Sequence, residues 1–274
     1  MPRSCARWKS GRVSCRLSAT CRPRSSTSSP ISSPHSTKPS RDSAQFAGQV
    51  NRMFDRVAGR YDALNSVMTA GLHHRWRERA AEQTQLGPGD SALDVCCGTG
   101  DLALELARRV SPSGHVIGCD FSEPMLDLAR EKAAERSTEG VRFEWADALQ
   151  LPYDGDRFDA LTVGFGVRNL ADLDRGLREM ARVLKPGGRA VILEITQPTR
   201  PPLSTFYSLW FDRIVPLLGT FSSDPEAYAY LPESVRSFPS PRGLAEKMDD
   251  AGFEQIHYTV LAGGIIAIHS GLRG

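Results

Sequence analysis

The chain has 274 residues, 40% hydrophobic and 24% charged, which is the balance of a globular protein large enough to bury a full core. No apolar run approaches the roughly 18–20 residues that cross a bilayer, so we expect no transmembrane helix. The net charge of +2 combines +8 in residues 1–45 with −6 in the remainder, and such a mildly acidic body argues against nucleic acid as a partner.

Residues 1–45 are rich in Ser, Arg and Pro and have no apolar periodicity, which predicts a disordered extension. Three explanations of it stay open. It is a segment without function, the product of an upstream start codon, or an organelle transit peptide, a class that is also rich in Arg and Ser and poor in acids.

The remaining residues, 46–274, are expected to form one domain that begins with helices. One helix is predicted around Gln49–Tyr61 and a second before the turn at 86–90 (LGPGD). We expect residues 46–85 to fold as a helical lid over the site formed by the segments that follow.

From Ser91 onward, strands and helices alternate. Strands are predicted at 91–97, 114–120, 141–147, 158–166 and 189–195, and helices at 100–110, 122–135 and 170–184. Ser122 is expected to cap the second of these helices, with Pro124 in its first turn. This alternation implies right-handed crossovers and a mostly parallel sheet covered on both faces.

The pattern changes after Thr196. Residues 197–240 are rich in proline and aromatic residues and are predicted to cover the substrate. A helix at 240–253 and a pair of strands within 254–271 end the chain. The predicted fold is α/β, a Rossmann-like and mostly parallel seven-stranded sheet with a terminal antiparallel hairpin, which is typical of class I methyltransferases.

The cysteines point to a reducing compartment. Three of the six lie in the extension and three in the body, at Cys96, Cys97 and Cys119. Adjacent Cys96 and Cys97 lack the spacing of a metal site, and neither HExxH nor paired CxxC occurs, so no metal is expected. We predict a cytoplasmic protein, or an organellar one if the extension is a transit peptide.

The segment Asp94–Gly100 (DVCCGTG) ends the first predicted strand of the sheet. Ligands of an open parallel sheet lie at the carboxyl ends of its strands, and Gly98 and Gly100 let the backbone approach a ligand at a helix N-terminus. Asp120, at the end of the next strand, suits a carboxylate that accepts both ribose hydroxyls of a nucleoside. The same spacing fits a dinucleotide site, so a nicotinamide-dependent oxidoreductase stays open.

Three acids favour S-adenosylmethionine over a dinucleotide. Asp94 precedes the glycines and is placed to orient the turn and the methionine amine. Asp101 would repel a pyrophosphate at the helix start, and Asp147 ends the third strand, where it suits the adenine amino group. Each of these positions, taken singly, also has a structural explanation: Asp94 could be the partner of a helix cap, and Asp147 could form a turn.

Several segments resemble the signatures of the menaquinone/ubiquinone-biosynthesis C-methyltransferases. The restricted ones are Tyr61–Asn65 (YDALN) with Thr69–Trp76 (TAGLHHRW), and Phe165–Asn169 (FGVRN). Arg182–Arg189 (RVLKPGGR), continued by Leu193–Thr196 (LEIT), contains LKPGG, which is shared widely among methyltransferases. The resemblance covers about residues 46–272.

The resemblance also carries cofactor contacts to specific positions. These are Thr99, Asp120, Asp147, Ala148 and Gly164, which add to Asp94, Gly98 and Gly100 of the turn. The sequence departs from the family at Leu64, where Met is common, and at Thr69, where Ser is common. At Gly164 some members place a cofactor-contacting Ser, so a hydroxyl contact is lost there and a backbone contact is left.

The reaction implied by the resemblance is methylation of a ring carbon of a reduced polyprenyl quinol, here demethylmenaquinol to menaquinol in menaquinone biosynthesis. Arg168 is expected beside the developing oxyanion, with a salt bridge that anchors its loop as the alternative. Asn169 is expected to orient a hydroxyl or to cap the next helix. His73 is a candidate proton acceptor, with packing of His73 and Trp76 against the sheet as the alternative. The substrate is expected beside Tyr61, Asn65, Trp76 and Tyr207.

Other functions stay open alongside this one. They are methylation of a polyprenyl quinol of the ubiquinone or phylloquinone pathway, methylation of another lipophilic molecule such as a sterol, and the oxidoreductase. The expected partner is a polyprenyl quinol, while peripheral membrane contact and a homodimer are left open by the sequence.

Overall fold

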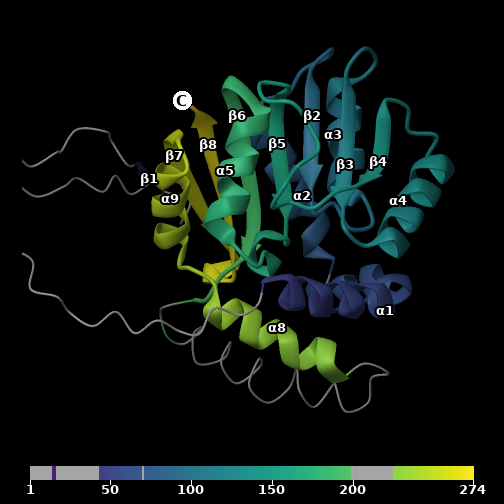
Figure 1. Ribbon diagram of the computed structural model, residues 1–274, viewed down its shortest axis with the longest axis vertical. Helices are drawn as coiled ribbons and strands as arrows, with labels where there is room; N and C mark the ends of the chain where they lie inside the picture. Colours follow the sequence, from purple (N-terminus) through teal and green to yellow (C-terminus); the bar gives the residue numbers. More distant parts are fainter. Residues whose placement is uncertain (1–13, 17–42, 70, 199–200, 202–224) are drawn as a thin grey trace, which may run out of the picture.

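The computed structural model describes residues 14–16, 43–69, 71–198, 201 and 225–274, which build one sheet flanked by helices (Figure 1). In sheet order the strands are β1 (Ser14–Arg16), β7 (Phe253–Leu261), β8 (Ile266–Arg273), β6 (Leu184–Ile195), β5 (Phe158–Gly164), β2 (Ser91–Val95), β3 (His115–Asp120) and β4 (Val141–Trp145). Strands β2 to β6 are parallel, and β8 is antiparallel to both β6 and β7. The predicted seven-stranded arrangement with its terminal antiparallel hairpin is confirmed, and β1 adds an edge strand on β7.

The helices follow the predicted alternation. They are α1 (Ser43–Thr69), α2 (Leu72–Gln83), α3 (Asp101–Val110), α4 (Glu123–Glu135), α5 (Leu173–Val183), α8 (Pro225–Ser237) and α9 (Pro241–Asp250). Short 3₁₀ turns occupy Val167–Asn169 and Ala262–Gly264. None of the helices within the described ranges is long and apolar enough to cross a membrane.

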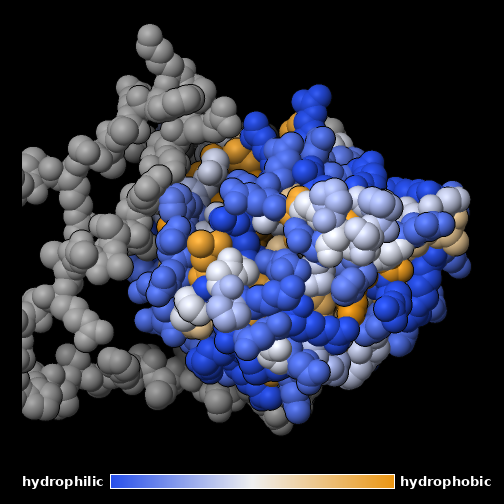
Figure 2. Space-filling view, turned by 90° about the horizontal axis from the view of Figure 1, so that it is seen from above, coloured by the Kyte–Doolittle hydropathy of each residue, from blue (hydrophilic) through white to orange (hydrophobic). Residues whose placement is uncertain are grey.

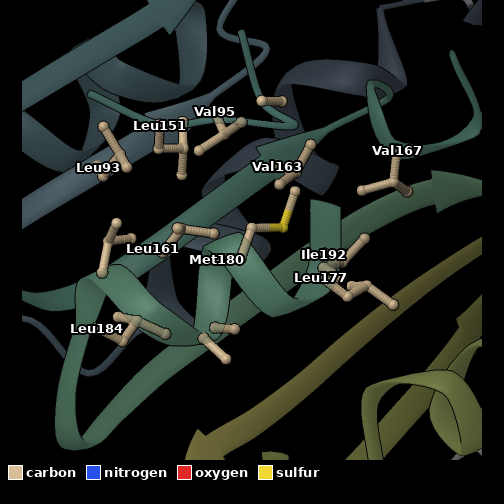
Figure 3. Close-up of a cluster of buried hydrophobic side chains, with 14 of the residues drawn as sticks. Leu93, Val95, Leu151, Leu161, Val163, Val167, Leu177, Met180, Leu184 and Ile192 are labelled. Atoms are coloured by element: carbon tan, nitrogen blue, oxygen red, sulfur yellow. The ribbon is translucent and has the colours of Figure 1, made fainter. Parts of the chain in front are cut away.

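Both faces of the sheet are buried, because its strands carry apolar side chains on either side. On one face α5 and α9 pack against the strands, and Leu177 and Met180 of α5 lie against Leu161, Val163 and Ile192 (Figure 3). On the other face lie α2, α3 and α4. The two helical layers fix where each strand ends, and therefore where the connecting turns lie.

The carboxyl ends of the parallel strands are covered by α1 and α8, which lie along the lower edge of the sheet in Figure 1. Figure 2 looks at the opposite end of the sheet, whose surface is mostly hydrophilic with scattered apolar side chains. Of the N-terminal helices, α1 thus lies at the edge where ligands of such sheets bind, whereas α2 packs on a face of the sheet.

Three boundaries differ from the prediction. Helix α1 is continuous to Thr69 and ends before Gly71, whose backbone is left-handed at φ 74°. Strand β6 begins at Leu184, so the predicted KPGG turn lies within it, next to a register shift on β5. The predicted disordered extension contributes β1, and its residues 1–13 and 17–42 lie outside the described ranges.

Candidate functional site

The cofactor turn, Asp94–Gly100, leaves the end of β2 and enters α3. Gly100 has a φ of 81°, and a Cβ there would lie 2.8 Å from the Phe143 ring and 2.9 Å from Ala129 Cβ. Glycine is therefore required for close packing as well as for the backbone conformation. Cys96 is also left-handed, at φ 54°, which costs a residue with a side chain about 1–2 kcal/mol.

Asp120, at the end of β3, holds this turn. Its two carboxylate oxygens accept hydrogen bonds from the backbone N–H of Gly98 at 2.9 Å and of Ser122 at 3.0 Å. Burial raises the pKa of Asp120, and these N–H donors act in the opposite direction. Asp120, which was predicted to bind the ribose, therefore lines the larger cavity described below and also holds the turn beside it.

Asp94 lies beside Thr162 in the register of β2 and β5, and its Oδ1 accepts a 2.6 Å hydrogen bond from the Thr162 hydroxyl. Its Oδ2 is buried and has no hydrogen-bond partner among the residues that the structure describes. Burial raises the pKa of Asp94 to about 7, although the Thr162 hydrogen bond acts to lower it. A buried carboxylate oxygen without a donor is costly unless a ligand donor completes it.

Two cavities meet at the cofactor turn. The larger cavity holds about 770 Å³ including its open mouth, and its walls come from α1, the ends of β3 and β4, and the loop after β5. The smaller cavity holds about 310 Å³ and is lined by Asp94, Thr99 and Arg77 among others. Cys96, Gly98 and Gly164 border both.

The segment after β4 supplies the wall predicted for the adenine. Asp147 and Ala148 both line the larger cavity. Ala148 is buried, whereas Asp147 is exposed and its Oδ1 accepts a 2.8 Å hydrogen bond from the backbone N–H of Leu149. Asp147 is thus both a turn former and a cavity residue, the two roles that the sequence offered for it.

Helix α1 is joined to the cofactor turn by ionic contacts. Asp62 accepts hydrogen bonds from the Thr99 hydroxyl at 2.7 Å and from Lys132 Nζ at 2.8 Å. Lys132 also binds Asp101 at 2.8 Å, and Arg77 lies 3.2 Å from the other oxygen of Asp101. Although burial opposes it, these two cations hold the pKa of Asp101 below its ordinary value. Because they also neutralise Asp101, its predicted repulsion of a pyrophosphate carries less weight than the sequence suggested.

A second contact of α1 lies one strand further along. The Ser122 hydroxyl donates a 2.6 Å hydrogen bond to Asp55, and Phe54 beside it lines the larger cavity. Ser122 occupies the predicted N-cap position of α4, but its side chain makes no capping hydrogen bond there. No individual role was predicted from the sequence for Phe54, Asp55, Asp62 or Lys132. Only the spacing of Asp55 and Asp62, seven residues or about two turns apart on one face of α1, could have indicated this pair.

The acceptor loop, which we define as Phe165–Asn169, follows β5. Phe165 is left-handed at φ 62°, a strained backbone for an aromatic residue. Its carbonyl accepts a 2.5 Å hydrogen bond from Arg168 Nη1, which lies 2.6 Å from Glu194 Oε1 at the end of β6. The Arg168 and Glu194 side chains are 7% and 1% exposed.

This pairing changes the interpretation of Arg168. Arg168 is not among the residues that line either cavity. Its positive charge is balanced by the Glu194 carboxylate. The structure therefore matches the alternative in which a salt bridge anchors the loop, and it does not bring Arg168 to the predicted position beside an oxyanion. Glu194 belongs to the segment Leu193–Thr196 (LEIT), for which the sequence predicts no role.

Asn169, by contrast, does line the larger cavity. Its Oδ1 accepts a 3.0 Å hydrogen bond from the hydroxyl of Tyr230 in α8. The cap of α5 is Asp172, whose side chain accepts from the N–H of Arg175, so Asn169 does not cap that helix.

His73 and Trp76 take the packing roles that were their alternatives. His73 is 2% exposed and Nδ1 lies 2.7 Å from the Thr69 hydroxyl. Burial, with the nearby charge of Arg77, lowers its pKa to about 4, which makes it a weak proton acceptor. Trp76 packs against the apolar cluster that includes Phe165. Neither residue lines the cavities described above.

The other predicted substrate residues lie outside what the structure describes. Tyr61 and Asn65 belong to α1, but their side chains are not described, and Tyr207 lies within the undescribed range 202–224.

His73, His74 and Asp101 place three metal-ligand atoms within 4.8 Å of one another. Asp101 is already bound by two cations, which disfavours a further positive ion.

Known proteins are similar to this chain in sequence and in fold. The model of the ubiE/COQ5 methyltransferase family matches residues 41–273, which is almost all of the chain after the extension. The chain belongs to the ubiE/COQ5 methyltransferase family. This membership confirms the family resemblance carried by YDALN, TAGLHHRW and FGVRN, and it makes the chain a methyltransferase that uses S-adenosylmethionine.

Curated relatives narrow the comparison. The demethylmenaquinone methyltransferase of Halalkalibacterium halodurans is 41% identical over 226 residues, which cover 82% of this chain and 92% of that protein. The demethylmenaquinone methyltransferase of Staphylococcus aureus is also 41% identical, with 82% and 93% covered.

Solved structures support the fold. A S-adenosylmethionine-dependent methyltransferase from Aquifex aeolicus superposes with a TM-score of 0.53 at 20% identity, covering 72% of this chain and 89% of that one. The [4+2]-cyclase SpnF gives 0.61 at 23% identity, covering 83% and 96%. Because one of these is named as a cyclase, the fold alone does not fix the reaction.

Proposed function

We propose that this protein methylates a ring carbon of demethylmenaquinol in menaquinone biosynthesis, with S-adenosylmethionine as methyl donor. The observation that carries the proposal is 41% identity to demethylmenaquinone methyltransferases over 82% of the chain. The site agrees with it, because an open cavity with apolar walls adjoins the cofactor turn. Phe54, Phe121, Met125, Leu149, Phe165 and Leu170 form much of those walls.

The residues around the turn fit the donor. Asp94 Oδ2, the buried oxygen without a partner, suits the ammonium group of the methionine part in the smaller cavity. Asp120 suits the ribose, and Asp147 with Ala148 suits the adenine. When bound, S-adenosylmethionine supplies a methyl group activated by a positively charged sulfur. Glycine at 164 and Thr99 border the same space, as the family resemblance expects.

The acceptor must be the reduced quinol, because a quinone ring carbon is too electron-poor to attack a methyl group. Loss of a hydroxyl proton to solvent moves charge onto the ring carbon, which forms the new C–C bond as the methyl–sulfur bond of the donor breaks. The ring carbon then gives up its own proton and the ring oxygen takes one up, which restores the quinol. We assign Asn169 the contact with that hydroxyl, since Asn169 lines the larger cavity and its Oδ1 accepts a hydrogen bond from Tyr230. Much of the rate enhancement then comes from holding the two reactants close together and excluding water.

Arg168 is assigned a supporting role. Its guanidinium fixes the Phe165 carbonyl and therefore the path of the acceptor loop, while Glu194 balances its charge. His73 is assigned to packing of α2, because a group with a pKa of about 4 binds a proton weakly at neutral pH. A polyprenyl tail is insoluble in water, so we place the reaction at a membrane surface, with the chain bound peripherally.

The proposal is tested in cells. We expect a strain that lacks this gene to accumulate demethylmenaquinone and to lose menaquinone, as read by mass spectrometry of its lipid quinones. Expression of this chain restores menaquinone, and expression of an Asp120→Ala variant does not. A quinone composition equal to that of the parent strain would contradict the proposal. Accumulation of a ubiquinone or phylloquinone precursor would show that the substrate belongs to that pathway instead.

A further inference from the structure

Cys96 occupies the junction of the two cavities. Of the three residues that border both, Gly98 and Gly164 have no side chain, so within the described residues Cys96 alone places one between them. On one side the smaller cavity contains the buried, unpartnered Asp94 Oδ2. On the other side the larger cavity contains Asn169 and Phe165 of the acceptor loop.

The Cys96 side chain also sets how closely the acceptor loop approaches the cofactor turn. A Cβ built on Gly166 would lie 2.4 Å from Cys96 Cβ and 3.1 Å from Cys96 Sγ. Atoms at such distances overlap, so the bare Cα of Gly166 rests directly on the Cys96 side chain. The contact joins the turn that holds the methyl donor to the loop that carries Asn169.

The chemistry of the thiol favours a steric role. Burial, reinforced by the charge of Asp120, raises the pKa of the Cys96 thiol well above its ordinary value, so the sulfur stays protonated and is a poor nucleophile. A side chain in this left-handed backbone is less favourable than glycine, which removes backbone preference as a reason for its presence.

We infer that Cys96 is a specificity-determining spacer, which through its contact with Gly166 fixes the separation of methyl donor and quinol ring. The inference rests on the proposed function and deepens it. A displacement of about 1 Å between reacting atoms is enough to lower a rate by about 100-fold. A spacer at the junction therefore affects kcat and the selectivity between quinol rings of different size more than it affects the affinity for the cofactor.

The test compares Cys96→Gly and Cys96→Ala with a matched control, Cys119→Ala, which removes a buried thiol of β3 that lines neither cavity. We expect Cys96→Gly to keep the Kd for S-adenosylhomocysteine within about threefold and to lower kcat for reduced demethylmenaquinone at least about tenfold. Its activity ratio between a naphthoquinol and a smaller benzoquinol should shift at least about threefold. The control should lower Tm while kcat stays within about twofold.

A double-mutant cycle tests the contact itself. We expect Gly166→Ala to lower kcat by about 100-fold or to prevent folding, and Cys96→Gly in that background to restore folded protein and at least about tenfold of the activity. Absence of rescue, or a Cys96→Gly variant whose kcat stays within twofold, would overturn the inference. So would a loss of S-adenosylhomocysteine affinity as large as the loss of kcat.

Failure of the proposed function gives a different result. A wild-type protein that binds S-adenosylhomocysteine but methylates no quinol overturns the proposed function. A wild-type protein that is active, together with an unchanged Cys96→Gly variant, overturns only the role of Cys96.

Discussion

The two halves of the site are built in different ways. The cofactor half is made of turns that directly follow β2, β3 and β4, and two of its acids bind backbone N–H groups of these turns, Asp120 those of Gly98 and Ser122 and Asp147 that of Leu149. The acceptor half depends on contacts between distant segments, such as Arg168 with Glu194 and Asn169 with Tyr230. The position of the first half follows mainly from the order of strands and turns, and that of the second from tertiary packing.

The largest expected effect lies in the cofactor half. Asp120→Ala removes the acceptor of two backbone N–H groups, each hydrogen bond contributing about 1 kcal/mol, as well as the proposed ribose contact. We expect S-adenosylhomocysteine affinity to fall at least about 100-fold by calorimetry. Asp147→Ala, at an exposed position that binds only the N–H of Leu149, should cost less than about tenfold. Equal losses would show that the two acids are equivalent.

The next effect separates stability from activity in the acceptor half. Glu194→Ala leaves the buried Arg168 charge without its carboxylate, and should lower the free energy of unfolding by about 3–5 kcal/mol. The double variant Arg168→Met with Glu194→Met should recover most of that stability, because replacing a buried ion pair by apolar side chains is often neutral. We expect its kcat to stay at least about tenfold low, since the Phe165 carbonyl loses its short hydrogen bond from Arg168 and keeps only the 3.5 Å one from Asn169 Nδ2 among the described residues. Recovery of both stability and kcat would limit the pair to a structural role.

A pH dependence sharpens the role of Asp94. With a pKa of about 7, roughly a tenth of the ligand-free protein carries this charge at pH 6 and roughly nine-tenths at pH 8. The affinity for S-adenosylhomocysteine should therefore rise about tenfold between these values. The folded-state pKa is raised, so the ligand-free protein should lose stability as pH rises from about 4 to 7. Asp94→Asn should remove both dependences, and their persistence in that variant would assign them to another group.

The smallest effect concerns α8. Tyr230→Phe removes one hydrogen bond to Asn169, worth about 1 kcal/mol, and should lower kcat/KM for the quinol about fivefold. S-adenosylhomocysteine affinity should not change, because none of the described side chains of α8 lines either cavity. A variant with altered cofactor affinity and normal kcat/KM would contradict the division of the site into two halves.

The same division explains what the sequence could predict. Asp94, Gly98, Asp120 and Asp147 follow predicted strands, so periodicity alone placed them at one edge of the sheet. Thr99 and Ala148 came from the family resemblance and line the cavities as expected.

The misplaced roles belong to tertiary contacts. Glu194 lies 26 residues from Arg168, and Asp62 lies 37 residues from Thr99. No local pattern reports a pair at such separations, so Arg168 was expected to face the ring while Glu194 had no role. His73 was expected to accept a proton because its unperturbed pKa is near neutral, and only its burial shows otherwise.

The central claim is tested most directly with the purified protein, labelled S-adenosylmethionine and a short-chain demethylmenaquinone, assayed under anaerobic reducing conditions and again with the oxidised quinone. We predict that label enters the ring carbon of the lipid product only under reducing conditions. Equal incorporation with the oxidised quinone, or none from a protein that still binds S-adenosylhomocysteine, would contradict it.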